Sequence, residues 1–151
     1  MKHIIKNIVQ SNTDTATAIN SVLLRLPAAL IFTAHGAQKL FGAFGGYGLE
    51  GTAGWMESIG LTPGYLLALL AGSAEFFGGL ALLLGLFVRP AALVLAFTMA
   101  VALFSVHAAN GLFMANNGYE FALAMLAMSA ALTATGGGKW SLDAWLAKKL
   151  A

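Results

Sequence analysis

Residues 64–88 read GYLLALLAGSAEFFGGLALLLGLFV, and Glu75 is the only charged residue among them. A bilayer core about 30 Å thick is crossed by about 20 consecutive, mostly apolar residues in an α-helix. The stretch therefore predicts a membrane-spanning helix that carries one carboxyl group near its middle.

Three further stretches predict spanning helices. The first, about Ser21–Phe41, is the most polar of the four. The third, from Pro90 to about His107, and the fourth, from Phe121 to about Thr135, contain no Asp, Glu, Lys or Arg. Proline is well tolerated in the first turn of a helix, so Pro90 suits the start of the third span. We expect an all-α integral membrane four-helix bundle.

The composition favours the same fold class. Of 151 residues, 59% are hydrophobic and 9% are charged, and the mean hydropathy is +0.80. Soluble domains carry about 25% charged residues, so these charges cannot cover a water-exposed surface. The net charge is only +2 with no basic run, which gives no support to a nucleic-acid partner. There is no cysteine, which excludes disulfides and thiolate metal sites.

The chain is predicted to divide into three parts: an amphipathic N-terminal lead-in (1–20), the membrane domain (21–138) and an amphipathic C-terminal tail (139–151). We also expect short helices at the membrane interface. One lies in the first loop, near Trp55, and one in the tail SLDAWLAKKL, where Ser141 is suited to the N-cap.

Lysine and arginine predict the orientation, because they accumulate on the cytoplasmic side of a membrane protein. With four spans, both termini and the middle loop share one side, and only Lys39 of the eight Lys and Arg residues falls on the other. Both termini are therefore expected in the cytoplasm. Arg25 and Arg89 are expected to act as cytoplasmic anchors, with Arg25 reaching the interface by snorkelling.

Ionisable side chains inside a bilayer cost at least about 2.5–3.5 kcal/mol and normally face the bundle interior. At 100° per residue, each span places its polar residues on the same face as small residues, which let helices approach closely in lipid. The residues expected to pack helices in this way are Gly36, Gly72, Gly78 and Gly79.

Five residues are candidates for a ligand pocket or proton relay open toward the non-cytoplasmic side. Glu75 is the deepest, and His35, Lys39, His107 and Glu120 lie in the outer half. Two interpretations stay open. Lys39, His107 and Glu120 lie near the boundary, where snorkelling or capping explains them, and Glu75 could simply join the first two helices through His35 or Lys39.

Cofactor motifs are weak. His35 and His107 meet the minimum for a bis-histidine haem, but two histidines without a CxxCH sequence do not favour haem. No Glu-x-x-His pair occurs on any span, so no metal site is predicted. No nucleophile triad, phosphate loop or dinucleotide fingerprint is present, and the catalytic residues are unknown at this stage.

Several segments carry a family resemblance. RLPAALIFTAHGAQKLFG (25–42), AGSAEFFGGLALLLGLFVRPAAL (71–93) and GGGKWSLD (136–143) resemble the DoxX family of bacterial inner-membrane proteins over about Val22–Asp143. The resemblance implies a four-helix, multi-pass fold in the bacterial inner membrane. It also implies association with redox systems such as quinol oxidase, thiosulfate–quinone oxidoreduction and quinone detoxification. His35, Lys39 and Glu75 match the family's polar positions, for which the family has no agreed catalytic role.

Three functions stay open. The first is a quinone- or lipophile-interacting accessory subunit of a membrane redox or redox-stress system. It needs a partner subunit or bound cofactor to carry electrons, and a quinone is the cofactor that the resemblance suggests. The second is a proton-coupled small-molecule transporter, which would need a homodimer because four spans are few. The third is a structural or assembly subunit without a ligand.

Overall fold

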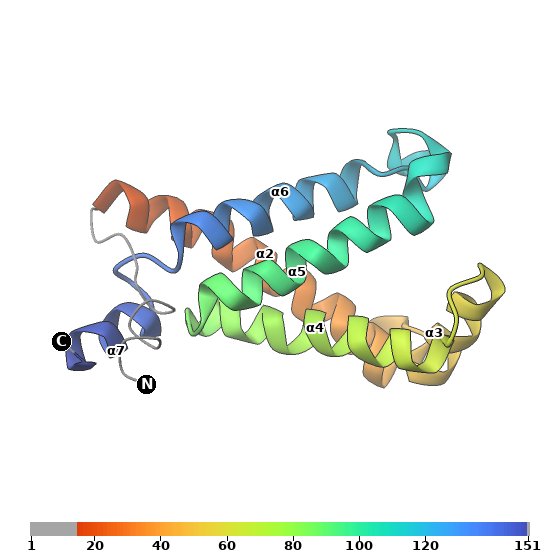
Figure 1. Cartoon of the computed structure of the whole chain (residues 1–151), viewed down its shortest axis with the longest axis horizontal. Coiled ribbons are helices and arrows are strands. Elements are labelled where there is room, and N and C mark those ends of the chain that lie inside the picture. Colours follow the sequence, from red (N-terminus) through yellow and green to blue (C-terminus); the bar gives the residue numbers. More distant parts are fainter. Residues whose placement is uncertain (1–14, 151) are drawn as a thin grey trace.

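The computed structural model describes residues 15–150, so most of the predicted lead-in lies outside the described residues. The described part of the chain is helical throughout, with no strands (Figure 1). Its α-helices are α2 (Thr15–Phe41), α3 (Gly48–Ser58), α4 (Gly64–Leu84), α5 (Val88–Ala102), α6 (Glu120–Thr135) and α7 (Leu142–Leu150). Short turns of helix complete it: η1 (Ala43–Gly45), the π-helical η2 (Leu103–His107), η3 (Ala108–Asn110) and η4 (Met114–Asn116).

Four helices, α2, α4, α5 and α6, form the bundle (Figure 1). The most extensive contacts are those of α2 with α4 and of α5 with α6. One end of the bundle carries α7, and the opposite end carries α3 and the loop that follows α5. These are called the α7 end and the α3 end below. The arrangement confirms the predicted all-α membrane bundle with short helices in the first loop and at the C-terminus.

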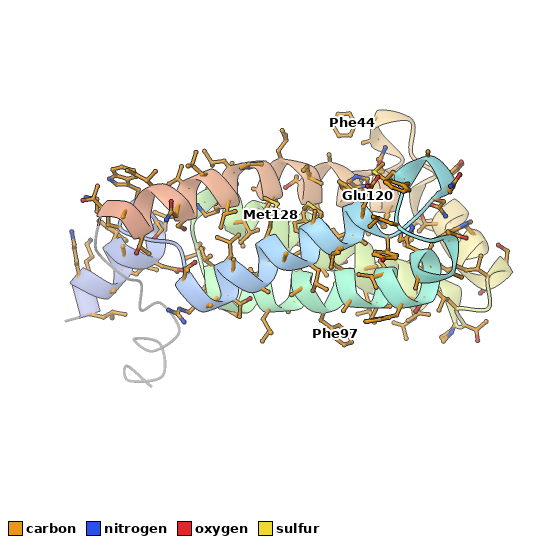
Figure 2. The ribbon with its side chains drawn as sticks, turned by 90° about the horizontal axis from the view of Figure 1, so that it is seen from above. Phe44, Phe97, Glu120 and Met128 are labelled. Carbon is orange, nitrogen blue, oxygen red and sulfur yellow. The ribbon has the colours of Figure 1, made fainter. Side chains whose placement is uncertain are left out.

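Three helical segments are long and apolar enough to cross a membrane: Thr15–Phe41, Gly64–Leu84 and Val88–Asn110. The last joins α5 to η2 and η3. The fourth predicted span, α6, is apolar but has only 16 residues. At 1.5 Å per residue it is about 24 Å long, which is less than the thickness of a bilayer core. Side chains such as Leu30 and Phe97 (Figure 2) are largely exposed on the outside of the bundle, as expected where helices face lipid.

Glycine controls how closely the first two spans approach. A methyl group on Gly36 would lie 2.7 Å from the Cα of Phe76 and 2.8 Å from the carbonyl oxygen of Gly72, so α2 and α4 touch backbone to backbone. Gly79 lies as closely against Thr33. Gly78 faces α5 instead, where an added methyl group would lie 3.0 Å from Leu95.

The span boundaries differ from the predicted ones at two places. Helix α2 already includes Thr15, so residues 15–20 of the predicted lead-in continue the first span. The third span ends in a π-helical and a 3₁₀ segment rather than in regular α-helix. Patterns of apolar residues mark the membrane core, but they do not mark where a helix continues beyond it.

The α7 end is closed by polar contacts from the C-terminal segment. Ser141 accepts a hydrogen bond from the N–H of Ala144 at 3.2 Å, which is the expected N-cap of α7. Asp143 is buried, and its two carboxylate oxygens accept the backbone N–H groups of Phe87 at 2.7 Å and Val88 at 2.9 Å. The tail therefore supplies the cap for the first turn of α5.

Arg25, the first expected cytoplasmic anchor, does not extend into open surroundings at the α7 end. Its side chain is buried at the α7 end and donates from Nη2 to the backbone carbonyl of Trp140 at 2.9 Å. Gly85 permits this position, because an added methyl group there would collide with the Arg25 guanidinium. The C-terminal segment covers the arginine before it can reach water. Arg89, the other expected anchor, is half-buried and donates to the carbonyl of Thr133 at 3.4 Å.

Candidate functional site

A buried ion pair joins the first two spans. The Nζ atom of Lys39, in the last turn of α2, lies 2.6 Å from Oε2 of Glu75, in the middle of α4. The glycine contacts between α2 and α4 bring these side chains together, since Gly36 and Gly72 each lie three residues before one partner. The Glu75 side chain is 3% exposed and that of Lys39 is 24% exposed, so the pair is open on the lysine side only.

A buried ion pair such as this one adds little to the stability of a fold. Removing two charges from water costs several kcal/mol per ion, and well-packed apolar side chains of similar volume often stabilise a protein as well or better. Charged residues inside spans are rare and usually mark a binding or proton pathway. The Lys39–Glu75 pair is therefore the best candidate for a functional site in the described residues.

His35 lies one turn before Lys39 on α2, at the surface of the bundle rather than inside it. Its ring packs against Phe121 of α6, with 5.7 Å between ring centroids and 46° between planes. The expectation that His35 points into the core is therefore wrong. Helical phase gives the angle between His35 and Lys39, but it does not say which neighbouring helix each will meet.

His107 and Glu120 hold the loop after α5 instead of joining the ion pair. The Nδ1 atom of His107 lies 2.9 Å from the carbonyl oxygen of Asn117. Glu120, at the start of α6 (Figure 2), accepts the backbone N–H of Met114 at 2.7 Å. Among the described residues, no hydrogen bond or ion pair connects either residue to Lys39 or Glu75. Of the five predicted residues, the structure pairs only Lys39 with Glu75 and places His35 beside them.

Two further observations concern metal and ligand sites outside the ion pair. Within residues 15–150, no group of three His, Cys, Asp or Glu residues is placed to hold a metal ion. An open apolar groove of about 340 Å³ runs between α4 and α5 and is lined by residues that include Ala74, Phe77, Ala81 and Val94. At 100° per residue, Ala74, Phe77 and Ala81 lie about 100° or more around α4 from Glu75, so the groove opens mainly on another side of that helix.

One functional feature escaped the sequence analysis. Asp143 was included in the tail as part of an interfacial helix, but it is buried and caps α5. Burial raises the pKa of its carboxyl group, while the two backbone N–H bonds and the charge of Arg25 lower it. The only signal in the sequence was the motif GGGKWSLD, whose glycines precede the aspartate.

Comparison with known proteins identifies the family of the chain. The DoxX family model matches residues 21–108, which include most of α2, all of α3 to α5 and both members of the ion pair. The chain belongs to the DoxX family. This DoxX protein is 31% identical over 115 residues to a protein of Bacillus subtilis called "Putative oxidoreductase CatD", covering 76% of this chain and 79% of that one. It is 33% identical over 133 residues to an uncharacterized protein of Haemophilus influenzae, covering 83% and 90%. No solved structure matches it.

Proposed function

We propose that this DoxX protein is an accessory subunit of a membrane redox or redox-stress system and binds a quinone or a similar lipophile beside the Lys39–Glu75 pair. The observation that carries the proposal is the pair itself, because its acid is buried and its lysine is partly open. The site lies within the spans, where a lipophile can arrive from the bilayer without crossing water.

The donor set suits a quinone head. An ammonium group has three N–H donors, and the structure uses one of those of Lys39 for Glu75. A second N–H is free to donate to a quinone carbonyl, and the exposed ring of His35 stands one turn away on the same helix. Phe121, against that ring, offers an apolar surface for the quinone ring.

A bound quinone would supply the redox chemistry by accepting two electrons and two protons to form a hydroquinone. The electrons would come from a partner subunit. Glu75 would pass protons to the ligand, and Lys39 would hold the carboxylate and orient the ligand carbonyl. The similarity to a protein called a putative oxidoreductase supports an assignment in this class.

The proposal includes the location. Membership of the DoxX family favours the bacterial inner membrane. Counting Lys and Arg beside the spans favours both termini in the cytoplasm, so the ion pair would lie in the half of the bundle near the outer face. The α7 end, with Lys148 and Lys149 exposed, would then face the cytoplasm. The quinone-binding function does not require a homodimer, whereas the alternative function as a transporter does.

The experiment is quinone binding by the purified full chain in lipid nanodiscs. Wild type is compared with Glu75→Gln, Lys39→Met and His35→Ala. Glu50→Gln is the matched control, because Glu50 is an exposed glutamate on α3. We expect weaker binding for the three site variants and unchanged binding for the control. Equal binding by all five proteins would refute the site.

The same preparations separate the two alternatives. A proton-coupled transporter would show flux across proteoliposomes that depends on pH and is lost in Glu75→Gln. A structural subunit would show no quinone binding in wild type, with Glu75→Gln lowering only the stability or the recovery of a partner. An optical spectrum and a mass spectrum of extracted lipids would identify any ligand that copurifies.

A further inference from the structure

The loop between α5 and α6 exposes its most apolar residues at its tip. Leu112 is 42% exposed, Phe113 is 64% exposed and Met114 is 57% exposed. These three residues, called the apolar tip below, follow one another in the chain. Three consecutive large apolar side chains left outside a fold indicate a contact that the single chain does not make.

The loop that carries this tip is firmly built. The N–H of Tyr119 donates to the carbonyl of Gly111 at 3.0 Å, and the N–H of Glu120 donates to the carbonyl of Leu112 at 2.9 Å. These two bonds hold the beginning and the end of the loop together. The Glu120 carboxylate accepts a hydrogen bond from the backbone N–H of Met114. The carbonyl oxygen of Asn117 accepts a hydrogen bond from Nδ2 of Asn110 at 3.2 Å, and it also lies within hydrogen-bonding distance of the His107 ring. The tip is thus held outward by polar contacts at its base.

The loop contains no charge. Residues 108–119 read AANGLFMANNGY, with no Asp, Glu, Lys or Arg. A loop in water can satisfy its backbone groups with solvent, whereas backbone at membrane depth must satisfy them internally because lipid offers no partner. Both the composition and the hydrogen bonding of this loop fit an environment with little water.

The position of the loop along the bundle also fits an environment with little water. Helix α6 is about 6 Å shorter than a bilayer core, so at least one of the segments that adjoin its ends must begin at membrane depth. Figure 1 shows this loop (cyan) at the same end as α3. There Tyr47, just before α3, and Trp55, within it, are exposed, and Tyr and Trp are the residues that gather at headgroup level.

We propose that the apolar tip inserts into the lipid interface at the α3 end, so that the α5–α6 loop is a membrane-embedded element and not an aqueous one. The lipid surface supplies the apolar contact that the chain lacks. This holds whether or not the quinone site is correct.

Spin labelling tests this directly, because the chain has no cysteine to remove. Phe113→Cys is labelled with a nitroxide in the full chain in vesicles of phosphatidylethanolamine and phosphatidylglycerol, and its collisions with oxygen and with a water-soluble nickel chelate are measured. Leu30→Cys, 72% exposed on α2, is the lipid reference, and Glu50→Cys is the aqueous reference. Met114→Cys repeats the measurement independently.

We expect the labels at Phe113 and Met114 to collide with the nickel chelate several-fold less often than the label at Glu50, and with oxygen nearly as often as the label at Leu30. Nickel collisions at the level of Glu50 would overturn the proposal, because the tip would then lie in water. Dipolar broadening between labels, lost on dilution with unlabelled protein, would also overturn it by assigning the tip to a second copy of the chain.

Discussion

The carboxylate of Asp143 accepts the backbone N–H of Val88 at 2.9 Å, so a side chain of α7 caps the first turn of α5. The same carboxylate takes the N–H of Phe87, and the N–H of Asp143 donates back to the carbonyl of Gly85 at 2.9 Å. The C-terminal segment is thereby part of the bundle. An anionic group at a helix N-terminus is also favoured by the helix dipole.

Asp143→Ala should destabilise the bundle by about 1–3 kcal/mol for each N–H group left buried without a partner. Unfolding of the purified protein in mixed micelles of SDS and a mild detergent measures this. Asp143→Asn is the matched variant. Its amide oxygen can still accept one of the two hydrogen bonds, so it should lower the free energy of unfolding by less than Asp143→Ala does. An Asp143→Ala protein as stable as wild type would contradict the capping role.

The pH dependence follows from the burial of the same carboxyl group. Burial raises the pKa of Asp143 above the ordinary 3.8, against the opposing effect of its hydrogen bonds and Arg25. Between 3.8 and the raised pKa, the folded chain keeps a proton that the unfolded chain has lost, so this group's contribution to stability falls as pH rises. The wild-type Tm should therefore decline relative to that of Asp143→Asn through this window. A relative rise would show that the hydrogen bonds outweigh burial.

The ion pair predicts an asymmetric double-mutant cycle. Lys39→Met leaves Glu75 buried without a partner, and breaking a buried pair in this way costs about 3–5 kcal/mol. Glu75→Gln should cost less, because the Lys39 ammonium is partly open to its surroundings and the glutamine amide oxygen can still accept from it. The double variant should be more stable than the sum of the single changes predicts. Additive effects, measured by the same unfolding assay, would mean that the two side chains do not interact.

Gly36→Ala should loosen the contact between α2 and α4, at a cost of about 1–3 kcal/mol for overpacking. Gly54→Ala on α3 is the matched control, since an added methyl group there meets nothing within 4 Å. It should be neutral or stabilise α3 by about 0.5–1 kcal/mol. Equal effects of the two changes on Tm would argue against the close helix crossing.

Glu120→Ala should loosen the α5–α6 loop without unfolding the bundle. It removes the acceptor of the Met114 N–H, so amide hydrogen exchange should speed up across residues 111–118 and stay unchanged in α4. Glu50→Ala, on the exposed face of α3, serves as the control. Unchanged exchange in the loop would show that other contacts are enough to hold it.

Sequence reasoning was most successful where lipid imposes a single requirement. A span needs about 20 apolar residues, and Gly64–Leu84 meets that requirement on its own. The fourth span was predicted at nearly the right residues, Phe121–Thr135 against Glu120–Thr135, but it is short for a bilayer. The apolar stretch of the sequence shows which residues can lie in the membrane. How much of the helix lies there also depends on the path of the loops at its two ends.

The candidate site was predicted only in part, for a physical reason. The apolar spans carry hydrophobic residues on all sides, so their sequence holds little information about how each helix is rotated against its neighbours. His35 and Lys39 are four residues apart on one face, yet one meets Phe121 at the surface and the other meets Glu75 inside. His107 and Glu120 were placed at the correct end, but their partners are backbone groups of a loop whose path no periodicity predicts.

By itself, the sequence determined the fold class, the helix order, the presence of Glu75 inside a span and the small residues that permit close packing. These follow from the thickness of the bilayer and the cost of charge within it. The tertiary structure alone decided that Lys39 is the partner of Glu75, that Arg25 is covered and that Asp143 caps α5. Those choices depend on contacts between residues 36 to 115 positions apart in the chain, which no local pattern encodes.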